Sequence, residues 1–107
     1  EKPVTELQLN APALSASIGQ VGEVDTYTLL VTQEGKYRVE TEGKLDMVMN
    51  LFGPNDATTF VAQDDDSGEQ LNARIVAILK PGSYTVRVRH YNNKRTGDYK
   101  IGFFTAV

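Results

Sequence analysis

The sequence contains no cysteine and no tryptophan, and only one of its 107 residues is histidine. The absence of cysteine excludes a disulfide scaffold, a thiolate zinc site and a cysteine nucleophile. Every apolar run is well short of the roughly 20 residues that a membrane-spanning helix needs, so we expect no membrane insertion. The fold must therefore depend on burial of apolar side chains and on hydrogen bonds.

The chain is mildly acidic, with a formal net charge of −3. This balance disfavours a dedicated nucleic-acid binder, because such domains are usually strongly basic. The length and the 40% share of hydrophobic residues suit one domain with one core.

Apolar residues recur with a period close to two through most of the chain, as is typical of strands with one buried face. Turns that contain glycine or proline separate about eight such segments, which predicts an all-β fold, an antiparallel β-sandwich of the jelly-roll or Greek-key type. The weakly patterned residues 1–12 are either a linker remnant or an edge strand, and 13–107 form the domain. The predicted strands are 13–18, 23–31, 36–42, 47–52, 59–62, 73–79, 83–91 and 98–104.

Two pairs of successive strands are predicted to form hairpins, 23–31 with 36–42 and 83–91 with 98–104. In 73–79, apolar residues occur in both phases of the alternation, so the inward face of this strand stays open.

Six segments occur in a specific order between residues 14 and 104, although each is a weak signal alone. They are Gly22–Leu29, Gly35–Val39, Asp46–Phe52, Asp64–Gly68, Leu79–Val88 and Gly97–Ile101. In this order they resemble the bacterial pre-peptidase C-terminal domain. One departure is Asp64, because the family often has asparagine at that position.

The resemblance implies a secreted or cell-surface module without catalysis of its own, attached to an extracellular hydrolase such as a peptidase. It also implies a relationship to the collagen-binding domains of clostridial collagenases. We therefore expect a monomeric unit, covalently attached to a larger parent chain, that binds a macromolecular substrate or aids secretion and stability. The expected partner is an extracellular protein such as collagen, or a polysaccharide. The alternatives are a carbohydrate-binding module and a structural or adhesive domain of a surface protein.

The aspartate run Asp64, Asp65 and Asp66 has two interpretations that overlap. In an extended segment Asp64 and Asp66 share one side and Asp65 faces the other, so one ion cannot easily collect all three. A bent loop could gather two of them with Asp46 or Glu69 around a calcium ion. Alternatively, the run braces a turn by accepting hydrogen bonds from loop N–H groups.

The alternation in 83–91 predicts that Arg87, Arg89 and Tyr91 line an outer face, with Lys100 nearby on the partner strand. This face is either solvated surface or a shallow ligand-binding surface, for which arginine and tyrosine are favoured residues. His90 falls in phase with the inward residues, so we expect a structural, hydrogen-bonded imidazole. Because no glycine-flanked serine nucleophile is present, we expect no catalysis.

Overall fold

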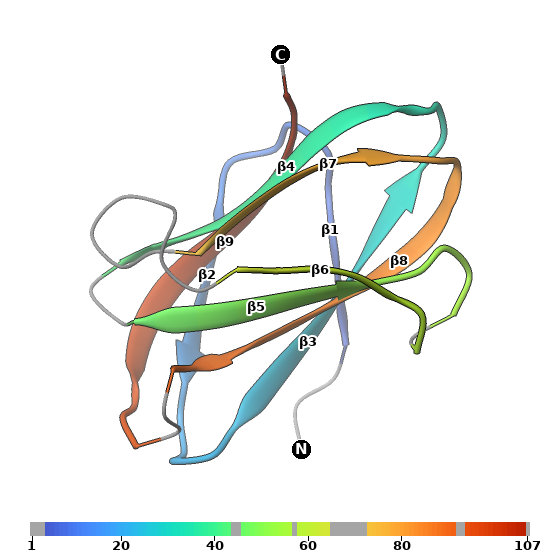
Figure 1. Ribbon diagram of the computed structural model, residues 1–107. Helices are drawn as coiled ribbons and strands as arrows, with labels where there is room; N and C mark the ends of the chain where they lie inside the picture. Colours follow the sequence, from blue (N-terminus) through green and yellow to red (C-terminus); the bar gives the residue numbers. More distant parts are fainter. Residues whose placement is uncertain (1–3, 44–45, 57, 65–72, 92–93, 107) are drawn as a thin grey trace.

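A computed structural model of the chain describes residues 4–43, 46–56, 58–64, 73–91 and 94–106. Within these residues, nine strands form two sheets that pack face to face, which confirms the predicted β-sandwich (Figure 1). Sheet A has the order β1 (Thr5–Leu7), β3 (Val24–Val31), β8 (Gly82–His90), β5 (Met47–Phe52) and β6 (Phe60–Asp64). Sheet B has the order β2 (Leu14–Ile18), β9 (Gly97–Thr105), β4 (Gly35–Gly43) and β7 (Arg74–Leu79).

The period-two alternation determines which side chains enter the core between the sheets. In β8 the inward residues are buried and the residues between them are partly exposed. Strand β5 differs because Met47, Val48 and Met49 are all buried, so this strand is covered on both faces. The core is therefore built from both sheets, with Phe103, Ile18, Leu29, Met47, Met49, Leu51 and Ile101 as its largest fully buried side chains.

The chain crosses from one sheet to the other at most of its connections. Among the described strands, β5 and β6 are the only successive pair that share a ladder. Both predicted hairpins are therefore wrong, because β3 pairs with β1 and β8 while β4 pairs with β7 and β9. Likewise, β8 and β9 lie in different sheets. Alternation reports which face of a strand is apolar, and two such strands can satisfy that pattern equally well by packing face to face.

Two Gly-x-Tyr sequences begin β4 and β8 and serve the same structural purpose. The hydroxyl of Tyr37 donates to the carbonyl of Gln33 at 2.6 Å, and that of Tyr84 donates to the carbonyl of Lys80 at 2.8 Å. Each tyrosine thus packs its ring in the core, while its hydroxyl stabilises the preceding turn through a hydrogen bond to a carbonyl of that turn. At the second turn Gly82 has a φ of +148°, and a Cβ there would lie 2.8 Å from Pro54, so a side chain is excluded.

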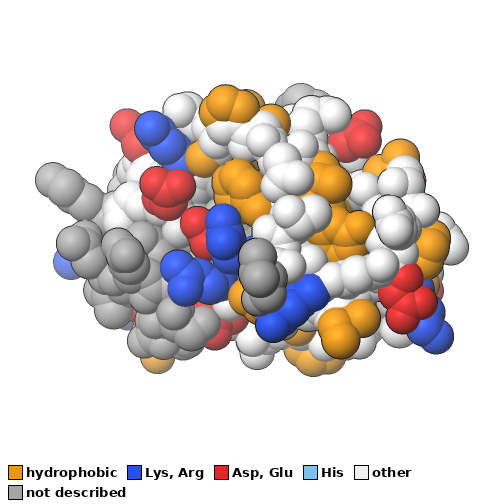
Figure 2. Space-filling model, turned by 90° about the horizontal axis from the view of Figure 1, so that it is seen from above, with side chains coloured by type: hydrophobic (Ala, Val, Ile, Leu, Met, Phe, Trp, Pro, Cys, Tyr) orange, Lys and Arg blue, Asp and Glu red, His pale blue; other side chains and the backbone are white. Residues whose placement is uncertain are grey.

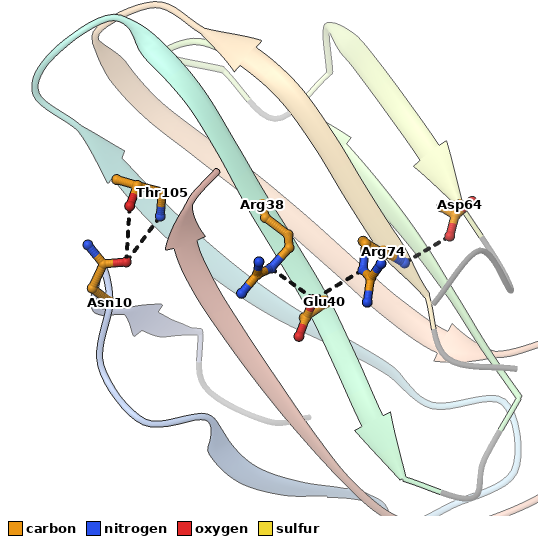
Figure 3. Close-up of polar contacts among 6 residues, drawn as sticks. All are labelled: Asn10, Arg38, Glu40, Asp64, Arg74 and Thr105. Atoms are coloured by element: carbon orange, nitrogen blue, oxygen red, sulfur yellow. Dashed lines mark hydrogen bonds and ion pairs between the residues drawn. The ribbon is translucent and has the colours of Figure 1, made fainter. Parts of the chain in front are cut away.

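The N-terminal segment connects both sheets. Strand β1 pairs in parallel with β3 of sheet A, and Leu9 then forms a bridge to Phe103 of sheet B. The amide of Asn10 donates to the carbonyl of Phe103 at 2.8 Å. Its side-chain oxygen accepts the N–H of Thr105 at 3.1 Å (Figure 3). The segment that the sequence left as linker or edge strand thus contains an edge strand, followed by a polar attachment to β9.

Candidate functional site

The outer side of β8 carries the three residues that the sequence predicts as a binding face. Tyr84, Val86, Val88 and His90 are buried on the inner side, and Arg87 and Arg89 project from the opposite side. Tyr91 follows the strand in the same phase as the arginines and is 53% exposed. Because β8 is the middle strand of sheet A, these side chains have neighbours from β3 on one side and from β5 on the other.

An aromatic pair from β5 and β6 extends this face. The guanidinium carbon of Arg87 lies 5.1 Å from the ring centroid of Phe52, which is a cation–π contact. Phe52 in turn meets Phe60 edge to face, with centroids 6.2 Å apart and planes at 74°. A register shift between Leu51 and Phe52 makes this meeting possible, because it brings Phe52 opposite Phe60. The Arg87 side chain is thus held against an apolar surface while its N–H groups keep donor capacity.

A hollow of about 230 Å³ is lined by Val48, Gln63, Arg89 and Tyr91. Its apolar floor is Val48, which is only 3% exposed although it does not belong to the core between the sheets. Nη1 of Arg89 donates to the carbonyls of His90 at 3.2 Å and Tyr91 at 2.7 Å, which fixes the guanidinium at the end of β8. The hollow therefore combines an apolar floor with an amide, a phenol and a positioned cation. We name the surface formed by Val48, Phe52, Phe60, Gln63, Arg87, Arg89 and Tyr91 the arginine face.

Lys100 does not belong to the arginine face, and the expectation that it lies nearby is wrong. It lies on β9 in sheet B, opposite Ser15 on one side and Glu42 on the other. With these residues and Asp98 it lines an open groove of about 700 Å³ on the outer side of sheet B. The error follows from the mistaken hairpin, because β8 and β9 lie in different sheets instead of pairing.

The structure separates the two predicted metal ligands that it describes. Asp46 precedes β5, and its carbonyl accepts the N–H of Tyr91 at 2.7 Å. Asp64 lies opposite Met49 at the end of β6, and its Oδ2 accepts the N–H of Arg74 at 2.8 Å (Figure 3). Asp65 and Asp66 lie outside the described residues. Within the described part of the chain, no group of three or more acidic or histidine side chains is placed to hold a metal ion.

Asp64 instead joins the two sheets where the chain leaves β6 and enters β7. Beside this bond, the N–H of Ala73 donates to the hydroxyl oxygen of buried Thr41 at 3.0 Å, and the Thr41 N–H donates to the Ala73 carbonyl at 2.9 Å. Nε of Arg74 also forms an ion pair of 3.2 Å with Glu40 (Figure 3). The described ends of the 65–72 segment are therefore held by β4 and by each other, which is a structural role for Asp64.

Residues 23–90 match the sequence profile of the family described as "Bacterial pre-peptidase C-terminal domain". The chain belongs to this family. Domains of the family are non-catalytic modules of peptidases. The only histidine of the pre-peptidase C-terminal domain is buried on the opposite side of β8.

Solved structures share this fold at low sequence identity. The pre-peptidase C-terminal domain of collagenase from Bacillus anthracis matches with a TM-score of 0.79 and 20% identity, over 96% of this chain and 96% of that one. PliG of Aeromonas hydrophila, a periplasmic inhibitor of g-type lysozyme, matches with a TM-score of 0.69 and 16% identity, over 94% of this chain and 93% of that one. PliG of Salmonella Typhimurium matches with a TM-score of 0.65 and 17% identity, over 95% of this chain and 97% of that one. The search of curated proteins gives no match.

Sequence reasoning missed three features of the pre-peptidase C-terminal domain. Phe52 and Gln63 join the arginine face because β8, β5 and β6 are neighbours, and that order is not readable from the sequence. Asp25, by contrast, falls in phase with inward Tyr27, so its burial was readable from the alternation. His90 is buried as expected, but its Nδ1 has no hydrogen-bond partner in the described part of the chain.

No helix able to cross a membrane occurs among the described residues.

Proposed function

We propose that this pre-peptidase C-terminal domain attaches a secreted or cell-surface hydrolase, most naturally a peptidase, to a macromolecular protein substrate through the arginine face. The observation that carries the proposal is the contact of Arg87 with Phe52 next to the hollow at Arg89 and Tyr91. These groups share one side of neighbouring strands, so a single ligand can reach all of them at once.

The chemistry of the arginine face suits an extended protein surface. Arginine offers several donors in a fixed plane, which match backbone carbonyls and carboxylates of a polypeptide. Phe60 is 58% exposed and Tyr91 is 53% exposed, so both supply contact area that association would remove from water. The likeness to the Bacillus anthracis collagenase domain supports collagen as the first protein to try.

A polysaccharide is the rival ligand, and the ring geometry makes it the weaker candidate. Sugar rings stack on exposed aromatic faces, usually on several that form one platform. Phe52 and Phe60 meet at 74°, so they do not form such a platform. Phe104 lies in sheet B beneath Arg38, 4.8 Å from its guanidinium carbon, and cannot extend the arginine face.

The proposal is tested by adsorption of the 107-residue chain to insoluble collagen, cellulose, chitin and xylan. We expect retention on collagen and none on the three polysaccharides. Replacing Arg87, Arg89 and Tyr91 together with alanine should abolish that retention while the fold is preserved. The matched control is Lys36→Ala with Lys100→Ala, which removes two positive charges from sheet B and should leave retention unchanged. Retention on a polysaccharide alone would favour the carbohydrate module, and failure on all four would favour a structural or adhesive domain.

A further inference from the structure

Arg89 borders the hollow of the arginine face, and no carboxylate of the described chain forms an ion pair with it. Its Nη1 donates to two backbone carbonyls, which position the guanidinium but carry no net negative charge. The arginines of sheet B are different, because Arg38 and Arg74 both form ion pairs with Glu40, at 2.9 and 3.2 Å. Figure 2, a view from above onto sheet B, shows basic side chains beside acidic ones. Arg89 thus keeps its positive charge for an anionic ligand.

The residues that line the hollow come from three neighbouring strands. Val48 lies opposite Arg89 in the ladder between β5 and β8, and β5 separates β8 from β6, which carries Gln63. Tyr91 follows the end of β8, where its N–H donates to the carbonyl of Asp46 at 2.7 Å. The arrangement therefore places a cation on one side of Val48, an amide on the other side and a phenol at the strand end.

The polar groups around the hollow can all donate hydrogen bonds. Nε and Nη2 of Arg89 are left for a ligand, because both bonds to backbone carbonyls come from Nη1. The side chains of Gln63 and Tyr91 form no hydrogen bond within the described residues, so each adds donor capacity. An ionised carboxylate is the complementary group, because it only accepts, and its two oxygens match the planar fork of a guanidinium.

We propose that the hollow binds a carboxylate of the polypeptide substrate. Arg89 balances its charge, Gln63 and Tyr91 donate to its oxygens, and its carbon stem lies on Val48, which is 3% exposed. Because the hollow is part of the arginine face, this role rests on the proposed function. The free C-terminus of a cleaved chain and an acidic side chain both present the group. The volume of about 230 Å³ is sufficient for either, since a cavity of about 150 Å³ holds benzene.

A phosphate group is the rival anion, and the single cation makes it the weaker candidate. A phosphate carries about 1.5 to 2 negative charges at neutral pH, and proteins usually bind it with clusters of arginine. Among the residues that line the hollow, Arg89 is the only basic one. A carboxylate carries one charge, which one guanidinium balances, and it also brings a carbon stem to the apolar floor at Val48.

The test is a titration of the isotope-labelled 107-residue chain with short capped peptides, followed through the side-chain N–H signals of Gln63 and Arg89. Ac-Gly-Pro-Ala-OH and its amide Ac-Gly-Pro-Ala-NH2 test a chain end. Ac-Gly-Glu-Gly-NH2 and Ac-Gly-Gln-Gly-NH2 test an acidic side chain. We expect saturable shifts with the acid of at least one pair, and at least about tenfold weaker binding of its uncharged counterpart. The pair that shows this difference identifies the source of the carboxylate.

Variants of the chain test the residues of the hollow directly. Gln63→Glu changes an exposed side chain and places a competing carboxylate beside Arg89, so binding of the acid peptide should weaken at least about tenfold. Arg89→Gln removes the cation and should have a similar effect. The matched control is Arg38→Gln, which removes the same charge from sheet B and should change the affinity by less than about twofold.

The carboxylate site is overturned by equal binding of acid and uncharged peptides, by absence of saturable shifts at Gln63 and Arg89, or by unchanged affinity in Gln63→Glu. Tighter binding of inorganic phosphate than of either acid peptide would also overturn it. Retention of the natural chain on collagen is measured separately. Retention without binding of an acid peptide would reject the carboxylate site alone, and binding of an acid peptide without retention would reject collagen as the substrate.

Discussion

The hydroxyl of Tyr99 donates a hydrogen bond of 2.5 Å to Oδ2 of Asp25, which joins β9 of sheet B to β3 of sheet A inside the core. The hydroxyl of Tyr27 lies 2.5 Å from that of Tyr99. Since the Tyr99 proton is directed at the carboxylate, Tyr27 is the donor in this second bond. Asp25 is 3% exposed, so the bond from Tyr99 compensates part of the cost of burying its carboxyl group.

Removal of the Tyr99 hydroxyl should destabilise the fold. Tyr99→Phe keeps the ring but takes one donor from a buried acid, so we expect the free energy of unfolding to fall by about 1–3 kcal/mol. Denaturation in urea measures this loss. Tyr27→Phe is the matched control, because Tyr27 is bonded to Tyr99 and its removal leaves the bond between Tyr99 and Asp25 in place. A loss for Tyr99→Phe no larger than that for Tyr27→Phe would contradict this account.

The Tyr99 hydroxyl should also make the stability of the fold decrease at high pH. Burial raises the pKa of the Tyr99 hydroxyl above its usual value of 10.0, and the hydrogen bonds with Asp25 and Tyr27 raise it further. A folded pKa above the unfolded value means that this contribution is complete below pH 10 and is lost progressively above it. Melting temperatures between pH 8 and pH 12 test the prediction. The decline should be steeper for the natural chain than for Tyr99→Phe, and parallel curves would count against it.

The carboxylate of Asp64 should stabilise the junction between β6 and β7. Asp64→Ala removes the acceptor of the Arg74 N–H, and we expect a loss of about 1–2 kcal/mol together with faster hydrogen exchange of that amide. Asp98→Ala is the control, because it deletes the same charge from an exposed position on β9 and should change stability by less than about 0.5 kcal/mol. Equal effects of the two substitutions would show that Asp64 has no bracing role.

The calcium hypothesis for the aspartate run makes a separate prediction. An ion that binds the folded chain and not the unfolded chain stabilises it by about 2.7 kcal/mol at a hundredfold excess over its Kd. The melting temperature should then be higher in calcium than in EDTA, and Asp66→Asn should reduce the difference. Identical melts in calcium and EDTA would leave the aspartates with the turn role alone.

Much of the fold follows from local patterns, and the misjudged parts share one cause. The alternation in 83–91 correctly separates inward Val86 and Val88 from outward Arg87 and Arg89, because side-chain direction in a strand depends on position alone. Which strands become neighbours depends on packing between segments that are distant in sequence. Lys100 was misplaced, and the contact of Arg87 with Phe52 was not foreseen, for that reason, since β8 has β5 beside it and β9 belongs to the other sheet.

The apolar strand β7 shows a second limit of sequence patterns. Its outward Val76 and Ile78 look like core residues, because an edge strand with an apolar outer face has the composition of a strand buried on both sides. Strand β5 has a similar sequence pattern and is covered on both faces. Only the strand order distinguishes them, because β5 lies inside sheet A and β7 lies at the edge of sheet B.

The central claim is that the arginine face is the ligand-binding surface. The most direct test is a titration of the isotope-labelled chain with a soluble triple-helical peptide of Gly-Pro-Hyp repeats, followed by amide chemical shifts. We predict that the shifts concentrate at Val48, Gln63, Arg87, Arg89 and Tyr91, which belong to the arginine face. Shifts confined to the groove at Lys100 or to β7, or no saturable shift at all, would contradict the account.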